Sequence, residues 1–190
     1  MTGELSYGHD LAPKQFTSSV YLFRETDGTW EIALLEHKKL GKWMVPGGHV
    51  EPNENPCEAA VREVREELDL KLRFLSSNHA HFSADLGDAR ETITPELIVE
   101  EFIRDDYEDG DHIHVDCLYL ARVRSGELDV NEREAATADW VTQESLPREE
   151  MFESTERLAD HFFSVMRTGD YRSIGSNLTK YDFDLHRVST

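Results

Sequence analysis

The sequence predicts an α/β fold, an α/β/α sandwich built around a mixed β-sheet. Two observations support this prediction: β-type and helical segments follow one another as strands, helix, strands, helix, and both helical segments are amphipathic. The chain of 190 residues shows no interior linker, so we expect one domain at residues 16–168. Residues 1–15 read as a polar N-terminal arm and residues 169–190 as a polar C-terminal tail.

The expected strands are short runs rich in β-branched and aromatic residues, bounded by turn residues. The first two strands flank a turn signal, Glu25 to Gly28, and are therefore expected to form a hairpin. The segments predicted as strands are residues 16–23, 30–37, 41–46, 70–75, 96–103, 112–123 and a short strand within 137–142.

Two segments have the apolar spacing of helices. In residues 56–68 Asn55 suits the N-cap, Pro56 the first helical position and Glu58 the third, where a capping-box carboxylate belongs. Residues 148–166 form the second predicted helix, with apolar residues at helical spacing.

The charge and composition exclude several classes of protein. A formal net charge of -19 disfavours binding to duplex nucleic acid and to anionic lipid surfaces. No segment has the roughly 18 to 20 apolar residues of a membrane span, and the N-terminus lacks the pattern of a signal peptide, so a cytoplasmic location is expected. Cys57 and Cys117 lie among apolar residues and are interpreted as small buried side chains.

Three glutamates of the first helix form a cluster. Glu63, Glu66 and Glu67 are spaced i, i+3 and i+4, broadly opposite an apolar stripe that includes Val64 and Leu68. Like charges at this spacing, in the C-terminal half of a helix, are destabilising unless a cation binds them. A solvated acidic face is the simpler interpretation of the glutamates taken alone; Mg²⁺, which prefers oxygen ligands, is the alternative.

The residues before the helix favour the metal site. Gly47 and Gly48 lead into a loop that ends at Glu54, and the helix then continues as Arg62-Glu63-Val64, Glu66-Glu67 and Asp69-Leu70. From Gly48 to Leu70 this segment resembles the Nudix box, G-x5-E-x7-R-E-U-x-E-E-x-G-U, where U is a bulky aliphatic residue. The one departure is Asp69 in place of the family's glycine, which concerns the end of the helix and not the metal ligands.

The resemblance implies a Nudix-type fold and a role for each matching residue. Glu63, Glu66 and Glu67, with the carbonyl oxygen of Gly47, would bind one or more Mg²⁺ ions, for which Mn²⁺ is a plausible substitute. Arg62 would orient Glu63, and Glu54 would support the loop. The implied reaction is Mg²⁺-dependent attack of water on a phosphorus of a nucleoside diphosphate linked to another group, with Glu63, Glu66 and Arg62 in the catalytic machinery.

The general base is expected on a loop before the last strand, as in some relatives. Glu134 is the first candidate there and Glu132 the second.

Trp43, Lys42 and Lys38 are candidates for contact with the small phosphorylated substrate, although packing and solvated surface explain them equally well.

His112, His114 and Asp116 alternate along an expected strand and therefore share one face. Zinc would suit such a pair of histidines, but the sequence shows no obvious further ligand, so a polar structural cluster is the preferred interpretation.

Two other functions compete with hydrolysis. A catalytically silent Nudix-fold module for ligand binding or regulation is the main alternative, and an isoprenoid diphosphate isomerase is another; the complete set of box carboxylates favours the hydrolase. Residues 85–88 carry neither the proline nor the tyrosine that marks relatives specific for ADP-ribose or dinucleoside polyphosphates, so the substrate stays open. Because dimers are common in the family, a homodimer is one expected assembly.

Overall fold

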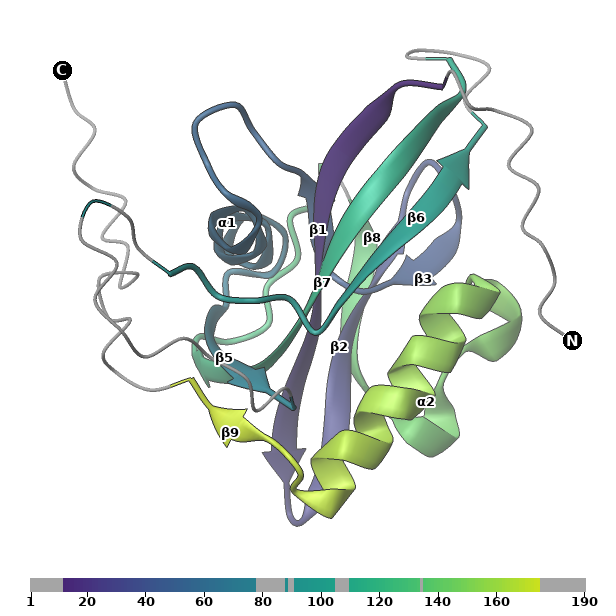
Figure 1. Ribbon diagram of the computed structural model, residues 1–190. Helices are drawn as coiled ribbons and strands as arrows, with labels where there is room; N and C mark the ends of the chain where they lie inside the picture. Colours follow the sequence, from purple (N-terminus) through teal and green to yellow (C-terminus); the bar gives the residue numbers. More distant parts are fainter. Residues whose placement is uncertain (1–11, 78–87, 89–90, 105–109, 134, 175–190) are drawn as a thin grey trace, which may run out of the picture.

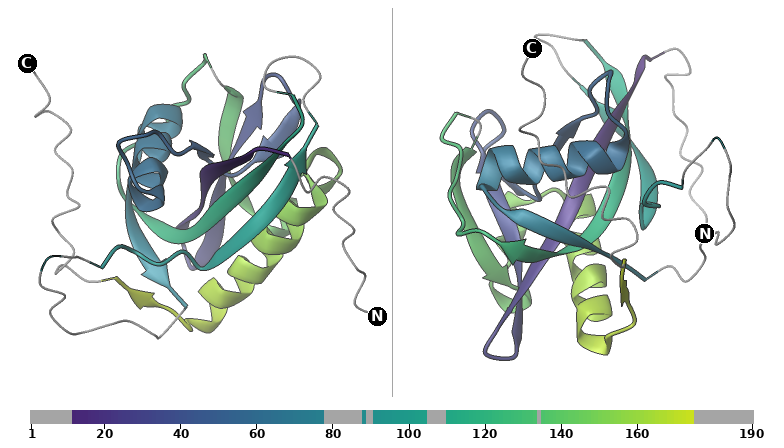
Figure 2. Two further views of the ribbon diagram at one scale, coloured as in Figure 1. Left: turned by 45° about the horizontal axis from the view of Figure 1, so that its top comes forward. Right: turned by 90° about the vertical axis from the view of Figure 1, so that its left-hand side faces the viewer.

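The computed structural model describes residues 12–77, 88, 91–104, 110–133 and 135–174. These residues form one mixed sheet with a helix packed on each side, which confirms the predicted sandwich (Figure 1; Figure 2). The elements are β1 Lys14–Thr26, β2 Thr29–His37, β3 Lys42–Met44, β4 Gly47–His49, α1 Pro56–Leu68, β5 Lys71–Ser76, β6 Leu97–Ile103, β7 His112–Ser125, β8 Ala135–Thr142, the short 3-10 turns η1 Gln143–Ser145 and η2 Arg148–Glu150, α2 Glu153–Thr168, and β9 Arg172–Ser173.

Strand β1 organises the sheet. It pairs parallel with β7 and antiparallel with both β2 and β4. The main strand order is β3-β2-β1-β7-β5-β9, with β4 added to β1, β6 to β7 and β8 to β2. The N-terminal half of β1 therefore lies between β4 and β7, which are far apart in the sequence.

Alternate residues of β1 face the two helices. Val20 and Leu22 belong to the core under α1, whereas Tyr21 and Phe23 belong to the core under α2. The second core is rich in aromatic contacts: the rings of Tyr21 and Phe162 have centroids 4.7 Å apart. Both cysteines are buried, as expected from their apolar neighbours.

Helix α1 has the ends that its sequence predicts. Asn55 and Glu58 form a complete capping box, with Pro56 at the first helical position. At the other end Asp69 adopts the left-handed conformation, φ 51° and ψ 31°, and its amide donates to the carbonyl of Arg65. Asp69 thus takes the conformation for which glycine is usually required.

Several boundaries differ from the prediction. Strand β1 starts at Lys14, so residues 14 and 15 of the expected arm lie in the sheet, and Arg172–Ser173 of the expected tail pairs with β5. Helix α2 begins at Glu153 rather than 148, because Met151 is drawn into a β-bridge with Trp43 and a 3-10 turn precedes it. Among the described residues, neither α-helix combines the length and apolar character needed to cross a membrane.

Candidate active site

The site forms where strand β4 meets helix α1. The amide of Gly47 donates to Oε2 of Glu67 at 2.9 Å. At Gly48 a β-carbon would lie 2.3 Å from Oε1 of Glu63, which is closer than any real contact. Gly48 therefore lets the main chain and the Glu63 carboxylate approach to a distance that a side chain would prevent, and Gly47 does the same for the main chain of β1 at Ser18 and Ser19.

The three box glutamates do not share one solvated face. Glu63 and Glu67 are buried, 8% and 5% exposed, whereas the Glu66 side chain is 54% exposed. The interpretation of the three glutamates as a solvated acidic face is therefore wrong for two of them. The physical reason is that β4, which begins with two glycines, covers this part of the helix: Glu63 occupies the space that a side chain at position 48 would fill, and Glu67 accepts a hydrogen bond from the Gly47 amide.

Arg62 connects the carboxylates. Its Nη1 donates to Glu63 Oε1 at 2.7 Å and to Glu66 Oε2 at 3.1 Å. Its Nη2 donates to Glu54 Oε1 at 2.7 Å and to the carbonyl of His49 at 2.9 Å, and its Nε also faces Glu54. All the donor nitrogens of the guanidinium are used, so the group fixes the loop, the strand and the helix relative to one another.

These contacts shift the ionisation of the network. The hydrogen bonds that Arg62 donates to Glu54 are the main cause of its raised pKa, and those that it donates to Glu63 add to the effect. Burial alone would raise the pKa of Glu54, but the hydrogen bonds from Arg62 and from the Glu51 amide outweigh it and hold that pKa below its ordinary value. Both groups are therefore charged at neutral pH.

The network has an excess of negative charge. Four carboxylates, those of Glu54, Glu63, Glu66 and Glu67, surround the single guanidinium of Arg62, which leaves a formal charge of -3 among these five groups. Buried carboxylates are costly unless cations balance them. Two buried carboxylates and one exposed carboxylate on one helix are hard oxygen donors of the kind that a divalent cation such as Mg²⁺ prefers.

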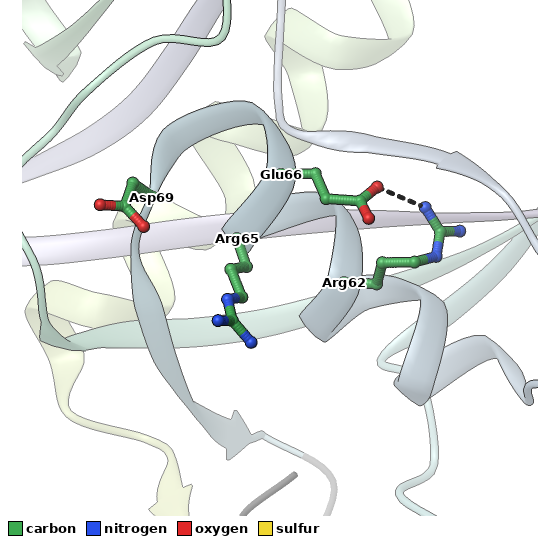
Figure 3. Close-up of a pocket in the computed structure, with 4 residues that line it drawn as sticks. All are labelled: Arg62, Arg65, Glu66 and Asp69. Atoms are coloured by element: carbon green, nitrogen blue, oxygen red, sulfur yellow. Dashed lines mark hydrogen bonds and ion pairs between the residues drawn. The ribbon is translucent and has the colours of Figure 1, made fainter. Parts of the chain in front are cut away.

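A surface pocket runs along the exposed side of α1, lined by Arg62, Arg65, Glu66 and Asp69 (Figure 3). Arg62 and Glu66 thus take part both in the carboxylate network and in this solvent-facing surface. Just past the end of the helix, the amides of Asp129 and Asn131 donate to the carbonyls of Leu68 and Glu67. The segment that precedes β8 is therefore attached to the C-terminal end of α1.

The other predicted site residues lie apart from this network. Lys42 and Trp43 are on β3, where Lys42 Nζ donates to the carbonyl of Glu149 and Trp43 Nε1 to Glu150 Oε2. Lys38 donates to the carbonyl of Glu132. These contacts engage all three side chains with protein groups. Glu134, the first candidate for the general base, lies outside the described residues.

Sequence reasoning missed one residue, His49. It follows Gly48 on β4 and lies beside His112 and His114 of β7, a pair that appeared to lack further ligands. No signal in the sequence brings it there, because the pairing of β4 and β7 with β1 is a property of the tertiary structure.

Comparison with known proteins identifies the family. The model of the NUDIX domain matches residues 13–162, so the chain belongs to the Nudix family, as its box residues indicated. A crystal structure of a NUDIX-family hydrolase from Clostridium perfringens has the same fold, with a TM-score of 0.61, 26% identity, and coverage of 80% of this chain and 97% of that one.

Two curated relatives are similar in sequence. A proposed 8-oxo-dGTP diphosphatase of Bacillus subtilis is 28% identical over 117 residues, which are 62% of this chain and 61% of that protein. Diphosphoinositol polyphosphate phosphohydrolase 3-beta of Bos taurus is 40% identical over 81 residues, 42% of this chain and 48% of that protein. The chain thus spans about half to three fifths of the length of these relatives.

Proposed function

We propose that the protein is a Mg²⁺-dependent pyrophosphohydrolase that cleaves the diphosphate linkage of a nucleotide or nucleotide derivative. The observation that carries this proposal is the network in which Arg62 joins Glu54, Glu63 and Glu66 beside the glycines of β4. The two curated relatives are both named for hydrolysis of phosphoanhydride bonds, which supports the same reaction class.

Each residue of the network has a task in this proposal. Glu63, Glu66 and Glu67 would hold the cation, with the carbonyl of Gly47 as a further oxygen donor. A cation bound there would supply positive charge to balance the phosphates and would make a bound water easier to deprotonate. Arg62 holds the Glu63 carboxylate in one orientation through their hydrogen bond, and Glu54 in turn holds Arg62.

A Mg²⁺ site would also explain how so acidic a protein can bind an anionic substrate. A chain with a net charge of -19 repels a polyphosphate unless a cation screens it locally. The general base that accepts a proton from the water is assigned to Glu134, with its neighbour Glu132 as the alternative. The segment that carries Glu132 lies near the end of α1, because Asn131 donates to the Glu67 carbonyl.

A substrate panel tests the proposal. Nucleoside triphosphates, an oxidised nucleotide, nucleotide sugars, ADP-ribose and dinucleoside polyphosphates are each incubated with the protein and Mg²⁺, and release of phosphate or diphosphate is measured. Glu63→Gln and Glu67→Gln are expected to lower turnover by orders of magnitude. Glu153→Gln, an equivalent change at an exposed glutamate of α2, is the matched control and is expected to keep full activity.

The same proteins are examined for metal binding without substrate. Mg²⁺ is expected to raise the melting temperature of the wild type and of Glu153→Gln, but not of the two box variants. If the wild type showed neither turnover nor a Mg²⁺-dependent rise in melting temperature, the hydrolase proposal would be rejected in favour of a catalytically silent ligand-binding or regulatory module.

A further inference from the structure

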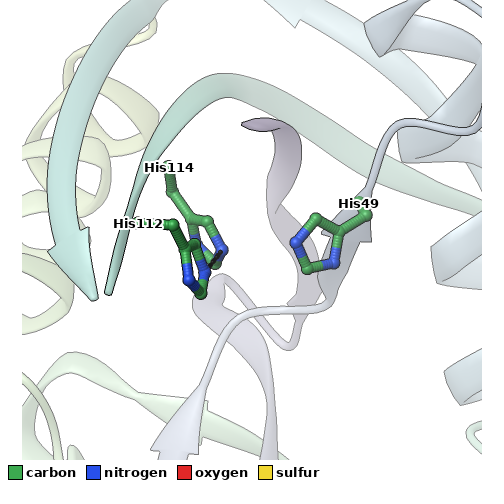
Figure 4. A group of neighbouring side chains, drawn as sticks. All are labelled: His49, His112 and His114. Atoms are coloured by element: carbon green, nitrogen blue, oxygen red, sulfur yellow. Dashed lines mark hydrogen bonds between the residues drawn. The ribbon is translucent and has the colours of Figure 1, made fainter. Parts of the chain in front are cut away.

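Three histidines from two strands meet on one face of the sheet. One ring nitrogen from each of His49 on β4 and His112 and His114 on β7 lies within 4.8 Å of the other two (Figure 4). Strand β1 lies between the two strands: Thr17 is in register with His49 and Gln15 with His114. We call these three residues the histidine cluster.

The histidine cluster is separate from the carboxylate network. Gly48 faces Glu63 on α1, and successive residues of a strand face opposite sides of the sheet, so His49 faces away from α1. The hydroxyl of Ser18, which is in register with Gly48, donates to the carbonyl of Pro56 at the start of α1, in agreement with this assignment. Strand β4 therefore contributes to both sites, with Gly48 on the face toward α1 and His49 on the opposite face.

Hydrogen bonds orient two of the imidazole rings. Nε2 of His49 lies 2.7 Å from the Gln15 Oε1 oxygen, so this nitrogen carries the proton and Nδ1 has the lone pair. Nδ1 of His112 lies 2.8 Å from the carbonyl of Gly110, which leaves the lone pair on Nε2. Such outward hydrogen bonds are typical of histidines that ligate metals, because they fix the tautomer and the ring plane.

The third ring, that of His114, is partly buried and lies against both of the others: its ring centroid is 5.0 Å from that of His49 and 4.8 Å from that of His112. Nε2 of His114 lies 3.0 Å from Nε2 of His112, within hydrogen-bond distance, and a metal bound by both nitrogens would replace this hydrogen bond.

We propose that the histidine cluster binds a divalent transition-metal ion of the zinc class, with one ring nitrogen from each of His49, His112 and His114 as ligands. Imidazole nitrogens suit zinc and its neighbours, whereas Mg²⁺ prefers oxygen. In tetrahedral zinc sites the metal–nitrogen distance of about 2.0–2.1 Å sets neighbouring nitrogens about 3.4 Å apart. The His112–His114 pair is near that separation, and the widest separation of 4.8 Å must contract.

The fourth coordination position would be open. A site with three protein ligands typically completes its tetrahedron with water or with an oxygen of a bound ligand. This site does not rest on the proposed hydrolase function, since it needs neither the box carboxylates nor a nucleotide.

Zinc binding to untagged protein tests this proposal. Zn²⁺ is titrated calorimetrically in the presence of excess Mg²⁺, which occupies oxygen-donor sites, and one tight site per chain is expected. His49→Gln, His112→Gln and His114→Gln are each expected to weaken it by more than ~100-fold, because the loss of an outer hydrogen-bond partner alone typically costs 10–100-fold. Gln15→Leu, which removes such a partner, should weaken binding by about 10–100-fold.

His161→Gln is the matched control, because His161 is exposed on α2 and belongs to no cluster among the described residues. It should bind Zn²⁺ like the wild type. A second measurement uses only the wild type and therefore does not depend on how well the variants fold. One equivalent of Zn²⁺ should shift the ring ¹⁵N resonances of His49, His112 and His114. Tight binding that survives in all three ligand variants, unchanged resonances of these rings, or no Zn²⁺ binding would each overturn the proposal.

Discussion

Gly48 offers the sharpest perturbation of the candidate site. In Gly48→Ala the new β-carbon would lie 2.3 Å from Oε1 and 2.7 Å from Cδ of Glu63, whereas ordinary contacts begin at 3.4 Å. The carboxylate must therefore move by about 1.1 Å, away from its hydrogen bond with Arg62. Displacements of this size at a reacting centre cost about 10²-fold in rate.

The effect on folding should be small by comparison. The atoms in the way belong to the end of a flexible side chain, and alanine restricts the unfolded chain more than glycine does, by roughly 0.4–1 kcal/mol. We expect kcat for the best substrate of the panel to fall about 100-fold, while the free energy of unfolding in urea changes by about 1 kcal/mol or less. The Mg²⁺-dependent rise in melting temperature should decrease as well.

Gly47→Ala is the contrasting variant. Its β-carbon would meet main-chain atoms, 2.5 Å from the carbonyl oxygen of Ser18 and 2.9 Å from the Cα of Ser19. Main chain cannot rotate away, so we expect a loss of about 1–3 kcal/mol in unfolding free energy, the usual cost of overpacking. If Gly48→Ala kept full activity, or lost as much stability as Gly47→Ala, the close approach of Gly48 and Glu63 would not position the site.

The remaining predictions concern other parts of the chain. Because the folded pKa of Glu54 lies below its ordinary value of 4.5, its ionised form stabilises the fold above that pH; the stability margin of wild type over Glu54→Gln in urea should shrink as pH falls below 4.5, and a pH-independent margin would contradict this. Asp69→Gly should raise the unfolding free energy by up to about 1 kcal/mol, since φ is 51° there, and a loss would show that the Asp69 side chain stabilises the helix end. Phe162→Ala should cost about 3–5 kcal/mol, because this fully buried ring packs against Tyr21; calorimetry measures it, and a cost below 1 kcal/mol would contradict the assigned packing.

The local chemistry of the helix is predictable from adjacent residues. Asn55 and Glu58 specify the start of α1 through the hydrogen bonds of the capping box, and Pro56 through its fixed φ at the first helical position; the structure contains all three features. Asp69 ends the helix in the left-handed conformation for an equally local reason. Short-range patterns suffice here because donor and acceptor are never more than a few residues apart.

The burial of the glutamates could not be predicted in this way. Helical periodicity places Glu63 and Glu67 away from the centre of the apolar stripe, but whether they meet water depends on what covers them. The covering element is β4, which approaches Glu63 closely only because position 48 has no side chain and which donates the Gly47 amide to Glu67. The glycines can be seen in the sequence, but their contact with the two glutamates depends on where the fold places β4.

The sequence by itself determined the sandwich architecture, the ends of α1, the family and the candidate carboxylate site, because these depend on periodicity and on residues close along the chain. Only the tertiary structure decided that Arg62 joins the loop, strand and helix, and that His49 meets His112 and His114. The physical reason is the register of β1: its parallel pairing with β7 and antiparallel pairing with β4 bring distant side chains to one face, and hydrophobic periodicity cannot specify which strands become neighbours.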